Sequence, residues 1–281
     1  MVKNKSRWLF LTAAFGSEKY NCAANRLISQ ATTLNLFDKL HIATLKDLRQ
    51  ISPMDLESIP QELLNSNHKF GYYFWKPLII SAGLQGFWGE FDGVVYVDAG
   101  SEILPGIMSQ LFFSFHFRNA YKNGISVFSI KTPEIAYTKR EVLQFFNLGQ
   151  EQFLSNQFQS GTIFLARDFG REICILWRDI CRLNPPLIFP NTSRPQYSKF
   201  IEHRHEQSIL SCLLRKIGVS ESKWAPGGIL INRSQQLLNL HRGVWWSRNI
   251  TAESTVSKSL QYILDKTTAK LIIASFFKPP R

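Results

Sequence analysis

Three short stretches of this 281-residue chain hold the side chains best suited to chemistry. The first is VVYVDAGSEI, residues 94–103, in which a run of β-branched and aromatic residues ends on Asp98. Ala99 and Gly100 follow, and two such small residues leave room for a ligand to approach the backbone. A carboxylate here could share a hard divalent cation with a diphosphate. Taken alone, however, the stretch favours a strand that ends in a polar turn.

The second stretch, GYYFWKPLII at residues 71–80, places four aromatic residues beside Lys76. One interpretation is an aromatic core patch from which the lysine reaches water. The other is an aromatic wall for a sugar or a base, with Lys76 offering a cation to phosphate. The residues of this stretch leave both interpretations open.

The third stretch, HRHEQSILS at residues 203–211, gathers two imidazoles, a guanidinium, a carboxylate and an amide at the expected start of a helix. The simpler interpretation is a solvated helix start, because the Glu206 carboxylate suits the positive end of the helix dipole. The functional interpretation is a polar cluster for general-base catalysis or phosphate binding. The adjacent His205 and Glu206 do not have a common metal-ligand spacing.

Apolar runs and helical periodicity predict strands that alternate with helices. Such alternation predicts an α/β fold with a mostly parallel central sheet, whose ligands lie beyond the carboxyl ends of the strands. Asp98 ends a strand that we expect to be central and buried. The expected strands are 8–15, 39–44, 92–98, 125–130 and 161–167, and the main helices 17–34, 77–88, 105–118, 138–148 with Thr138 as its N-cap, 168–183 and 205–218. The last third is more irregular, with a strand at 227–232 and a helix near 253–265.

Basic residues outnumber acidic ones by 33 to 21, which gives a formal net charge of +12. This excess would attract nucleic acid, an anionic membrane surface or phosphate-bearing molecules. The basic residues are scattered, and no block of five or six like charges marks a nucleic-acid-binding arm. We therefore expect an anionic membrane surface, rather than nucleic acid, as a partner.

Several classes of protein lose their main signature. The chain has no Walker-type phosphate loop, no Gly-x-Gly-x-x-Gly fingerprint and no Gly-x-Ser-x-Gly elbow. Its four cysteines have no Cys-x-x-Cys spacing and are expected as buried free thiols of a reducing compartment. The apolar stretch near the N-terminus suits a first strand better than a signal peptide. No run approaches the roughly 18 apolar residues that span a bilayer, so we expect a cytoplasmic protein.

Taken together and in this order, the three stretches resemble a family of bacterial nucleotide-sugar-dependent glycosyltransferases of the GT-A fold, found in capsule and lipopolysaccharide synthesis. The resemblance extends to TAAFGSEKY, EIAYTKREVL and FQSGTIFLAR. It implies a single GT-A-like domain over residues 1–281. A Rossmann-like part that binds the nucleotide-sugar would span about residues 1–130, and an acceptor and catalytic part about 131–281.

The resemblance also implies roles for particular residues. Asp98 would take the first place of an Asp-x-Asp-like motif that holds the donor diphosphate, and Glu206 would be the catalytic base beside it. The other implied donor-binding residues are Thr12, Ala13, Phe15, Gly16, Trp75, Lys76, Ala99 and Gly100. The implied acceptor or phosphate contacts are His203, Arg204, His205, Gln207, Thr138 and Lys139.

Two positions depart from the family pattern. Gly100 stands in place of the second acid, so binding of the expected Mn²⁺ or Mg²⁺ would rest on Asp98 as its metal ligand. Glu206 stands where the family has Asp, which keeps the charge and moves it by one methylene group.

The implied reaction is transfer of a sugar from a nucleotide-sugar donor to a hydroxyl of a glycan or lipid-linked glycan acceptor. The expected setting is bacterial surface polysaccharide or lipopolysaccharide synthesis, at the inner face of the plasma membrane. The alternative is a non-catalytic protein that binds a nucleotide-sugar or an anionic glycan on the same scaffold.

Overall fold

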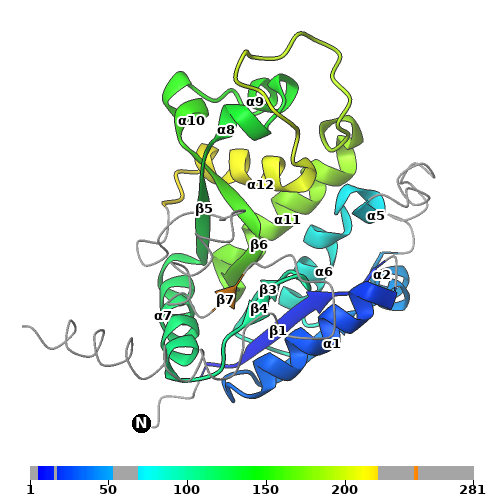
Figure 1. Cartoon of the computed structure of the whole chain (residues 1–281), viewed down its shortest axis with the longest axis vertical. Coiled ribbons are helices and arrows are strands. Elements are labelled where there is room, and N and C mark those ends of the chain that lie inside the picture. Colours follow the sequence, from blue (N-terminus) through cyan, green and yellow to red (C-terminus); the bar gives the residue numbers. More distant parts are fainter. Residues whose placement is uncertain (1–5, 16–17, 53–68, 221–243, 246–281) are drawn as a thin grey trace, which may run out of the picture.

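The computed structural model describes residues 6–15, 18–52, 69–220 and 244–245. A five-stranded sheet in the order β2-β1-β3-β6-β5 forms its centre (Figure 1). The strands are β1 (Trp8–Ala13), β2 (Lys39–Ala43), β3 (Gly93–Val97), β5 (Ile125–Pro133) and β6 (Asn156–Ala166). A short second sheet pairs β4 (Glu102–Ile103) with β7 (Val244–Trp245).

The directions of the strands confirm the expected α/β fold with a mostly parallel sheet. β1 runs parallel to β2 and to β3. β6 runs antiparallel to both β3 and β5, so it alone of the five is reversed. The strand order turns back at β1, because the chain places β2 on one side of it and β3 on the other. In α/β sheets, ligands bind beyond the carboxyl ends of strands at such a switch point.

β3 is central because it can be buried on both faces. All five of its residues are buried, as the apolar run GVVYV predicts. Gly93 begins the strand where a Cβ atom would lie 2.4 Å from the ring of Trp8. A larger residue at this position would therefore push β1 and β3 apart.

Helices cover both faces of the sheet. α1 (Glu18–Thr32) and α7 (Ile107–Asn123) pack Leu27, Ala31, Phe112 and Phe113 onto one face. The other face carries α6 (Trp75–Leu84), α11 (Arg167–Leu183) and α12 (His205–Lys216). The remaining helices are α2 (Leu45–Ile51), α5 (Lys69–Tyr72), α8 (Glu134–Tyr137), α9 (Arg140–Phe145), α10 (Gln150–Leu154) and the 3₁₀ helix η1 (Pro185–Leu187).

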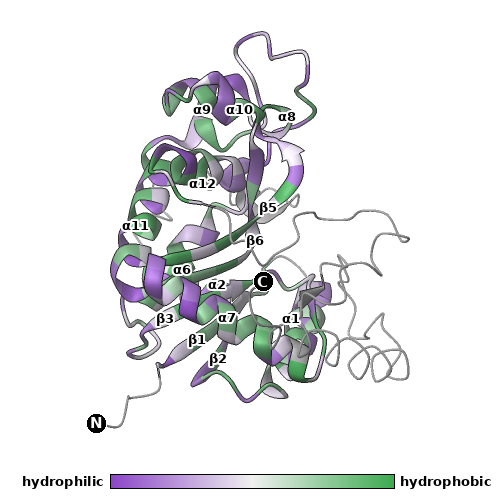
Figure 2. Ribbon diagram, turned by 90° about the vertical axis from the view of Figure 1, so that its left-hand side faces the viewer, coloured by the Kyte–Doolittle hydropathy of each residue, from purple (hydrophilic) through white to green (hydrophobic). Residues whose placement is uncertain are grey.

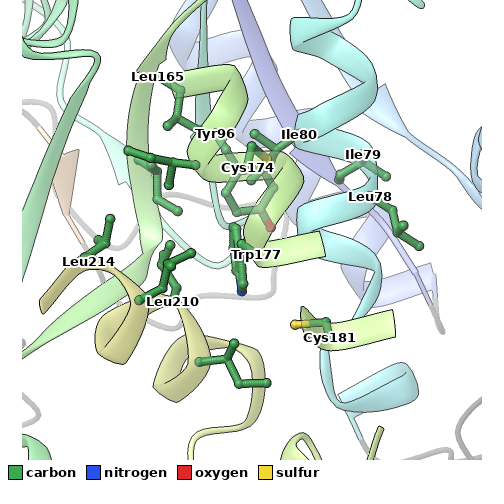
Figure 3. Close-up of a cluster of buried hydrophobic side chains, with 14 of the residues drawn as sticks. Leu78, Ile79, Ile80, Tyr96, Leu165, Cys174, Trp177, Cys181, Leu210 and Leu214 are labelled. Atoms are coloured by element: carbon green, nitrogen blue, oxygen red, sulfur yellow. The ribbon is translucent and has the colours of Figure 1, made fainter. Parts of the chain in front are cut away.

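Trp177 of α11 lies in the middle of the second face. Figure 3 shows its ring between Leu210 and Leu214 of α12 and the side chains of α6. The indole N–H donates to the backbone carbonyl of Glu206 at 3.0 Å. Apolar and polar residues alternate along α11 (Figure 2), and its buried residues include Ile173, Cys174 and Cys181. The core thus reaches the first turn of α12.

Several boundaries differ from the expected ones. β6 begins at Asn156, five residues before the expected start, because its first half is polar and still buried at Gln157, Gln159 and Ser160. The helix expected at 138–148 is the shorter α9, with Lys139 at its N-cap. Thr138 is instead the C-cap residue of α8, and its hydroxyl donates to Glu134, which corrects that expectation.

The expected division of a single domain into a nucleotide-sugar-binding part and an acceptor part stays a prediction. The strand expected at 227–232 and the helix near 253–265 lie outside the described residues. Across the described segments, no helix has both the length and the apolar character that crossing a bilayer requires.

Candidate active site

One residue from each of the three stretches meets at the carboxyl end of β3. The Lys76 ammonium lies 3.1 Å from Oδ1 of Asp98 and 3.0 Å from Oε1 of Glu206. The sequence predicted each of these side chains as a site residue, but no pattern in the sequence showed that they touch. The structure therefore joins three candidates into one cluster of charge, which we call the Lys76 cluster.

Each member of the Lys76 cluster is held by the element that carries it. Lys76 is in the first turn of α6 and Glu206 in the first turn of α12. Asp98 follows β3, and its backbone N–H donates to the carbonyl of Gly161 on β6 at 2.8 Å. Because all three elements pack on β3 or β6, the geometry of the cluster depends on the packing of the sheet.

The three side chains differ sharply in exposure. The side chains of Lys76 and Glu206 are only 3% and 2% exposed, whereas that of Asp98 is 43% exposed. Asp98 is thus the member of the cluster that a substrate can reach directly. With all three groups ionised, the cluster carries one net negative charge.

Burial and pairing set the protonation states. Burial lowers the pKa of Lys76, but Asp98 and Glu206 outweigh burial and raise that pKa above its ordinary value. Burial raises the pKa of Glu206, and the Lys76 ammonium opposes that rise. A buried charge that kept no partner would be far more costly, so Lys76 is the cation that allows two carboxylates to lie side by side.

Two tyrosines complete the surroundings of the ammonium. Its nitrogen lies 5.2 Å from the ring centre of Tyr73 and 5.3 Å from that of Tyr96, within the range of cation–π attraction. The Tyr96 hydroxyl donates to Oδ1 of Asp98 at 2.7 Å. Burial, followed by the Asp98 charge, raises the pKa of Tyr96, so the phenol keeps its proton. Oδ1 of Asp98 is therefore engaged, and its Oδ2 has no hydrogen bond among the described residues.

Ser160 and Tyr96 were not predicted as site residues. The Ser160 hydroxyl donates to Oε1 of Glu206 at 2.7 Å and accepts from Lys76 at 3.2 Å. Tyr96 stands two residues before Asp98, and this spacing places both on one face of an extended strand. That signal could have identified Tyr96, but Ser160 lies 84 residues from Lys76 and only the fold brings it there.

The loop after β3 is held from behind by α1. Nη2 of Arg26 donates to the carbonyls of Ala99 and Ser101, at 3.2 Å and 2.9 Å. One turn further along α1, the side-chain oxygen of Gln30 accepts the N–H of Ile103 at 2.9 Å. Arg26 is buried, and Glu102 favours its charge while burial disfavours it. Hydrogen bonds from α1 thus fix the segment that begins at Asp98.

The surroundings of Asp98 do not fit a metal centre built from protein ligands. Gly100 offers no carboxylate, and the described part of the chain contains no group of three or more His, Cys, Asp or Glu side chains that could hold a metal ion. The Lys76 ammonium, 3.1 Å from Asp98, already pairs with Oδ1 of that carboxylate. The expected ligand set is therefore reduced to a single outward carboxylate oxygen.

The other donor-binding candidates line the same end of the sheet. Thr12 and Ala13 are buried at the end of β1, and Ala99 is buried beside Ala23 and Ala24 of α1. Phe15 packs edge-on against Trp75, with ring centres 4.5 Å apart. Both rings are buried, so they contribute to the core more than to an open aromatic wall. Gly16 lies outside the described residues.

Three of the expected acceptor or phosphate residues instead hold the segment 186–191. The Lys139 ammonium donates to the carbonyls of Pro186, Phe189 and Asn191. His203 contacts the carbonyl of Leu187, and His205 that of Ile188. Burial lowers the pKa of His203 to about 3, so this ring is neutral near pH 7.

The other three expected contacts are also engaged inside the protein. The Arg204 guanidinium lies 3.6 Å from the ring centre of Tyr137 and pairs with Glu202. Gln207 donates to Gln157, and Thr138 donates to Glu134. The geometry therefore favours positioning roles for the six expected residues His203, Arg204, His205, Gln207, Thr138 and Lys139, rather than the acceptor or phosphate contacts we expected.

No protein-family model matches the sequence, and no curated protein matches it either. Among solved structures, the chain is similar to mouse xyloside xylosyltransferase 1 in its apo form, with a TM-score of 0.41, 13% identity, and coverage of 77% of this chain and 84% of that one. It is also similar to a glycosyltransferase involved in glycosylation of the major capsid of PBCV-1, with a TM-score of 0.34, 14% identity, and coverage of 69% and 80%.

A third similar structure is the apo form of the bifunctional glycosyltransferase WbbM, with a TM-score of 0.38 and 10% identity. It is matched over 76% of this chain and 38% of its own length. Superpositions this loose carry no argument about activity, so any assignment of function depends on the site itself.

Proposed function

We propose that this protein is a glycosyltransferase that moves a sugar from a nucleotide-sugar donor to a hydroxyl of a glycan acceptor. One observation carries the proposal. Lys76, Asp98 and Glu206, from the three stretches that resemble such enzymes, meet within 3.1 Å contacts at the carboxyl end of the central strand. This end of the sheet, where the strand order turns back, is where α/β proteins bind their ligands.

Asp98 is the proposed catalytic residue. Its Oδ1 is held by Lys76 and Tyr96, and the side chain is 43% exposed. A general base must lie within hydrogen-bond reach of the hydroxyl that it serves. Of the two carboxylates in the Lys76 cluster, Asp98 meets this condition and the 2% exposed Glu206 does not.

Glu206 takes a different role from the one we first expected. Its carboxylate is turned inward to Lys76 and Ser160, so it cannot take a proton from an acceptor in this arrangement. We propose that Glu206 is a positioning residue, which holds the Lys76 ammonium against Asp98. The donor loop of β1, with Thr12, Ala13, Phe15 and Gly16, stays a proposal for the nucleotide side.

A divalent cation would neutralise the diphosphate of the donor when bound. Because the residues around Asp98 do not fit a protein-held metal, we assign no step to one.

The finer assignment is also a proposal. We place the reaction in bacterial surface polysaccharide or lipopolysaccharide synthesis, with a glycan or lipid-linked glycan acceptor at the inner face of the plasma membrane. The support is the resemblance of the three stretches to that family, together with the excess of 33 basic over 21 acidic residues.

Replacement of Asp98 by Asn tests the proposal. The amide keeps the size of the carboxylate and removes its charge, so the fold should survive. We expect transfer to fall about 100-fold, or about 3 kcal/mol in the transition state. Sugar transfer would be measured over a panel of nucleotide-sugars with and without Mn²⁺, with melting temperature as the control for folding. Near-normal transfer by a folded Asp98→Asn protein would overturn the assignment of the site.

A second candidate function is a binding protein that takes up a nucleotide-sugar or an anionic glycan without turning it over. The inward position of Glu206 and the absence of a carboxylate at Gly100 favour it. Donor hydrolysis without acceptor separates the two candidates. A transferase consumes the donor slowly under these conditions. A binding protein leaves the donor intact and is only stabilised by it, by about 2.7 kcal/mol at a donor concentration of 100 times the dissociation constant, which raises the melting temperature.

A further inference from the structure

A second buried carboxylate, Glu134, lies at the start of α8, where the site does not use it. It is fully buried and accepts hydrogen bonds from Thr138, Ser211 and Gln157. Within the described residues, Glu134 has no ion pair with a lysine or an arginine. Burial raises the pKa of Glu134, and the hydrogen bonds from Ser211, Thr138 and Gln157, together with the charge of Arg215, oppose that rise. A buried carboxylate is costly to keep, and its hydrogen bonds link it to the site.

A chain of amides leads from Glu134 toward the Lys76 cluster. Nε2 of Gln157 donates to Oε1 of Glu134 at 3.1 Å. Nε2 of Gln207 donates to Oε1 of Gln157 at 2.8 Å. Oε1 of Gln207 then accepts the backbone N–H of Ser160 at 3.3 Å. We call these three bonds the amide relay.

The amide relay ends on the residue that bridges the charged groups. Ser160 donates its hydroxyl to Glu206 at 2.7 Å and accepts from Lys76 at 3.2 Å. The Lys76 ammonium also contacts the carbonyl of Ser160 at 3.4 Å. The position of Ser160 therefore affects how Lys76 is shared between Glu206 and Asp98.

The amide relay has a direction, and Glu134 sets it. An amide side chain has one donor end and one acceptor end, whereas an ionised carboxylate only accepts. Because Glu134 takes the NH₂ end of Gln157, the oxygen of Gln157 must face Gln207. Gln207 must then present its own oxygen to the N–H of Ser160. A single amide turned round would bring two donors or two acceptors face to face.

We propose that Glu134 is a positioning residue of the transferase site, which acts through the amide relay to fix Ser160 and thereby Lys76 against Asp98. This inference rests on the proposed function. It assigns Gln207 and Thr138 to the supporting network behind the site.

A charge-conserving pair of substitutions tests the direction of the relay. In Gln207→Glu, the new carboxylate can still accept the N–H of Ser160, but it has no N–H to donate to the oxygen of Gln157. If the Gln157 amide flips to donate to the new carboxylate, its oxygen then faces the carboxylate of Glu134, and two acceptors meet. Adding Glu134→Gln removes this conflict, because the new amide can donate to the turned Gln157. The double variant thus moves the acid from one end of the relay to the other and restores a consistent direction.

We expect Gln207→Glu to lower kcat on the order of tenfold with little change in the KM for donor, which corresponds to about 1.4 kcal/mol. Adding Glu134→Gln should recover kcat several-fold. If Glu134 and Gln207 each had only a structural role, their substitutions would act independently on kcat. The double variant would then be at least as slow as Gln207→Glu. That additive outcome would overturn the proposal.

A second readout separates this inference from the proposed function. The ¹⁵N–¹H resonance of the Ser160 backbone amide reports its bond to Gln207 without turnover. It should move in Gln207→Glu and return toward the wild-type position in the double variant. A wild-type protein that neither transfers nor hydrolyses any donor would refute the proposed function alone, whereas unchanged Ser160 resonances in an active series would refute the relay alone.

Discussion

At the scale of single residues, the site depends on one buried cation. Lys76 separates two carboxylates that would otherwise repel each other, and its ion pairs join the three sequence stretches. The Lys76 side chain itself is 3% exposed. Its contribution is to fix the orientation of Asp98, together with the Tyr96 hydroxyl.

Replacing Lys76 by Met should therefore destabilise the protein strongly. The change leaves Glu206 buried without a cation, which typically costs about 3–5 kcal/mol of unfolding free energy. Denaturant unfolding would measure this loss. The double variant Lys76→Met with Glu206→Gln is the matched control, because it removes the unpaired charge and should recover most of the stability.

The stability of Lys76→Met should also depend on pH. Without Lys76, burial and the Asp98 charge raise the folded pKa of Glu206 above the unfolded value, and only the Ser160 hydrogen bond opposes them. The folded state then binds a proton more readily than the unfolded state, so the loss of stability should shrink as the pH falls from neutral toward the ordinary pKa of a glutamate. A loss that grows as pH falls over this range would contradict the assigned burial of Glu206.

At the scale of elements, α1 and β6 position the Lys76 cluster, whose members come from α6, the end of β3 and α12. α1 grips the loop after β3 through Arg26 and Gln30, and β6 supplies Ser160. β6 is the reversed strand of the sheet, and its polar first half extends past the end of β3. This extension of the reversed strand brings the Ser160 hydroxyl beside Lys76 and Glu206.

Replacing Arg26 by Lys tests whether the hydrogen bonds from α1 position the loop after β3. A lysine keeps the charge but loses the planar group whose Nη2 serves two carbonyls. Hydrogen bonds to charged groups contribute about 1.5–3 kcal/mol each, so we expect the KM for donor to rise about tenfold, with a smaller change in kcat. The exposed Arg118→Lys on α7 is the matched control and should leave both constants unchanged. Equal behaviour of the two variants in steady-state kinetics would exclude a role of Arg26 in placing the loop.

At the scale of the whole molecule, the net charge of +12 is the property most relevant to its setting. Scattered basic residues create a long-range attraction to anionic surfaces that salt screens. An enzyme that extends a lipid-linked glycan would benefit from such an attraction, since it raises the local concentration of acceptor.

We therefore expect the full chain to bind vesicles that contain phosphatidylglycerol and to leave them as salt rises. The screening length falls from about 10 Å at 0.1 M to about 3 Å at 1 M salt, so cosedimentation should drop several-fold over this range. Vesicles of pure phosphatidylcholine are the control. Binding that does not change with salt, or no binding at low salt, would contradict this prediction. The positive charge would then serve only to attract the substrate.

The sequence by itself determined much of the fold and supplied the candidate site residues. Short apolar runs and helical spacing located the five strands of the main sheet, because burial on one or both faces leaves a pattern in local sequence. An acid after a buried run made Asp98 a candidate, and a lysine among aromatics made Lys76 one, but each stretch alone left a turn or a core patch open. The expected roles of both residues came from the resemblance of the three stretches, taken in order, to a glycosyltransferase family.

Only the tertiary structure decided how those residues are used. The burial of Glu206, the engagement of His203, His205 and Lys139 with the segment 186–191, and the place of Ser160 depend on contacts between distant parts of the chain. The first half of β6 was not predicted as strand because its residues are polar. These buried polar residues pair with side chains from distant parts of the chain, which no local pattern reveals. Exposure and charge pairing arise from packing, and packing decided that Asp98 is the exposed member of the Lys76 cluster.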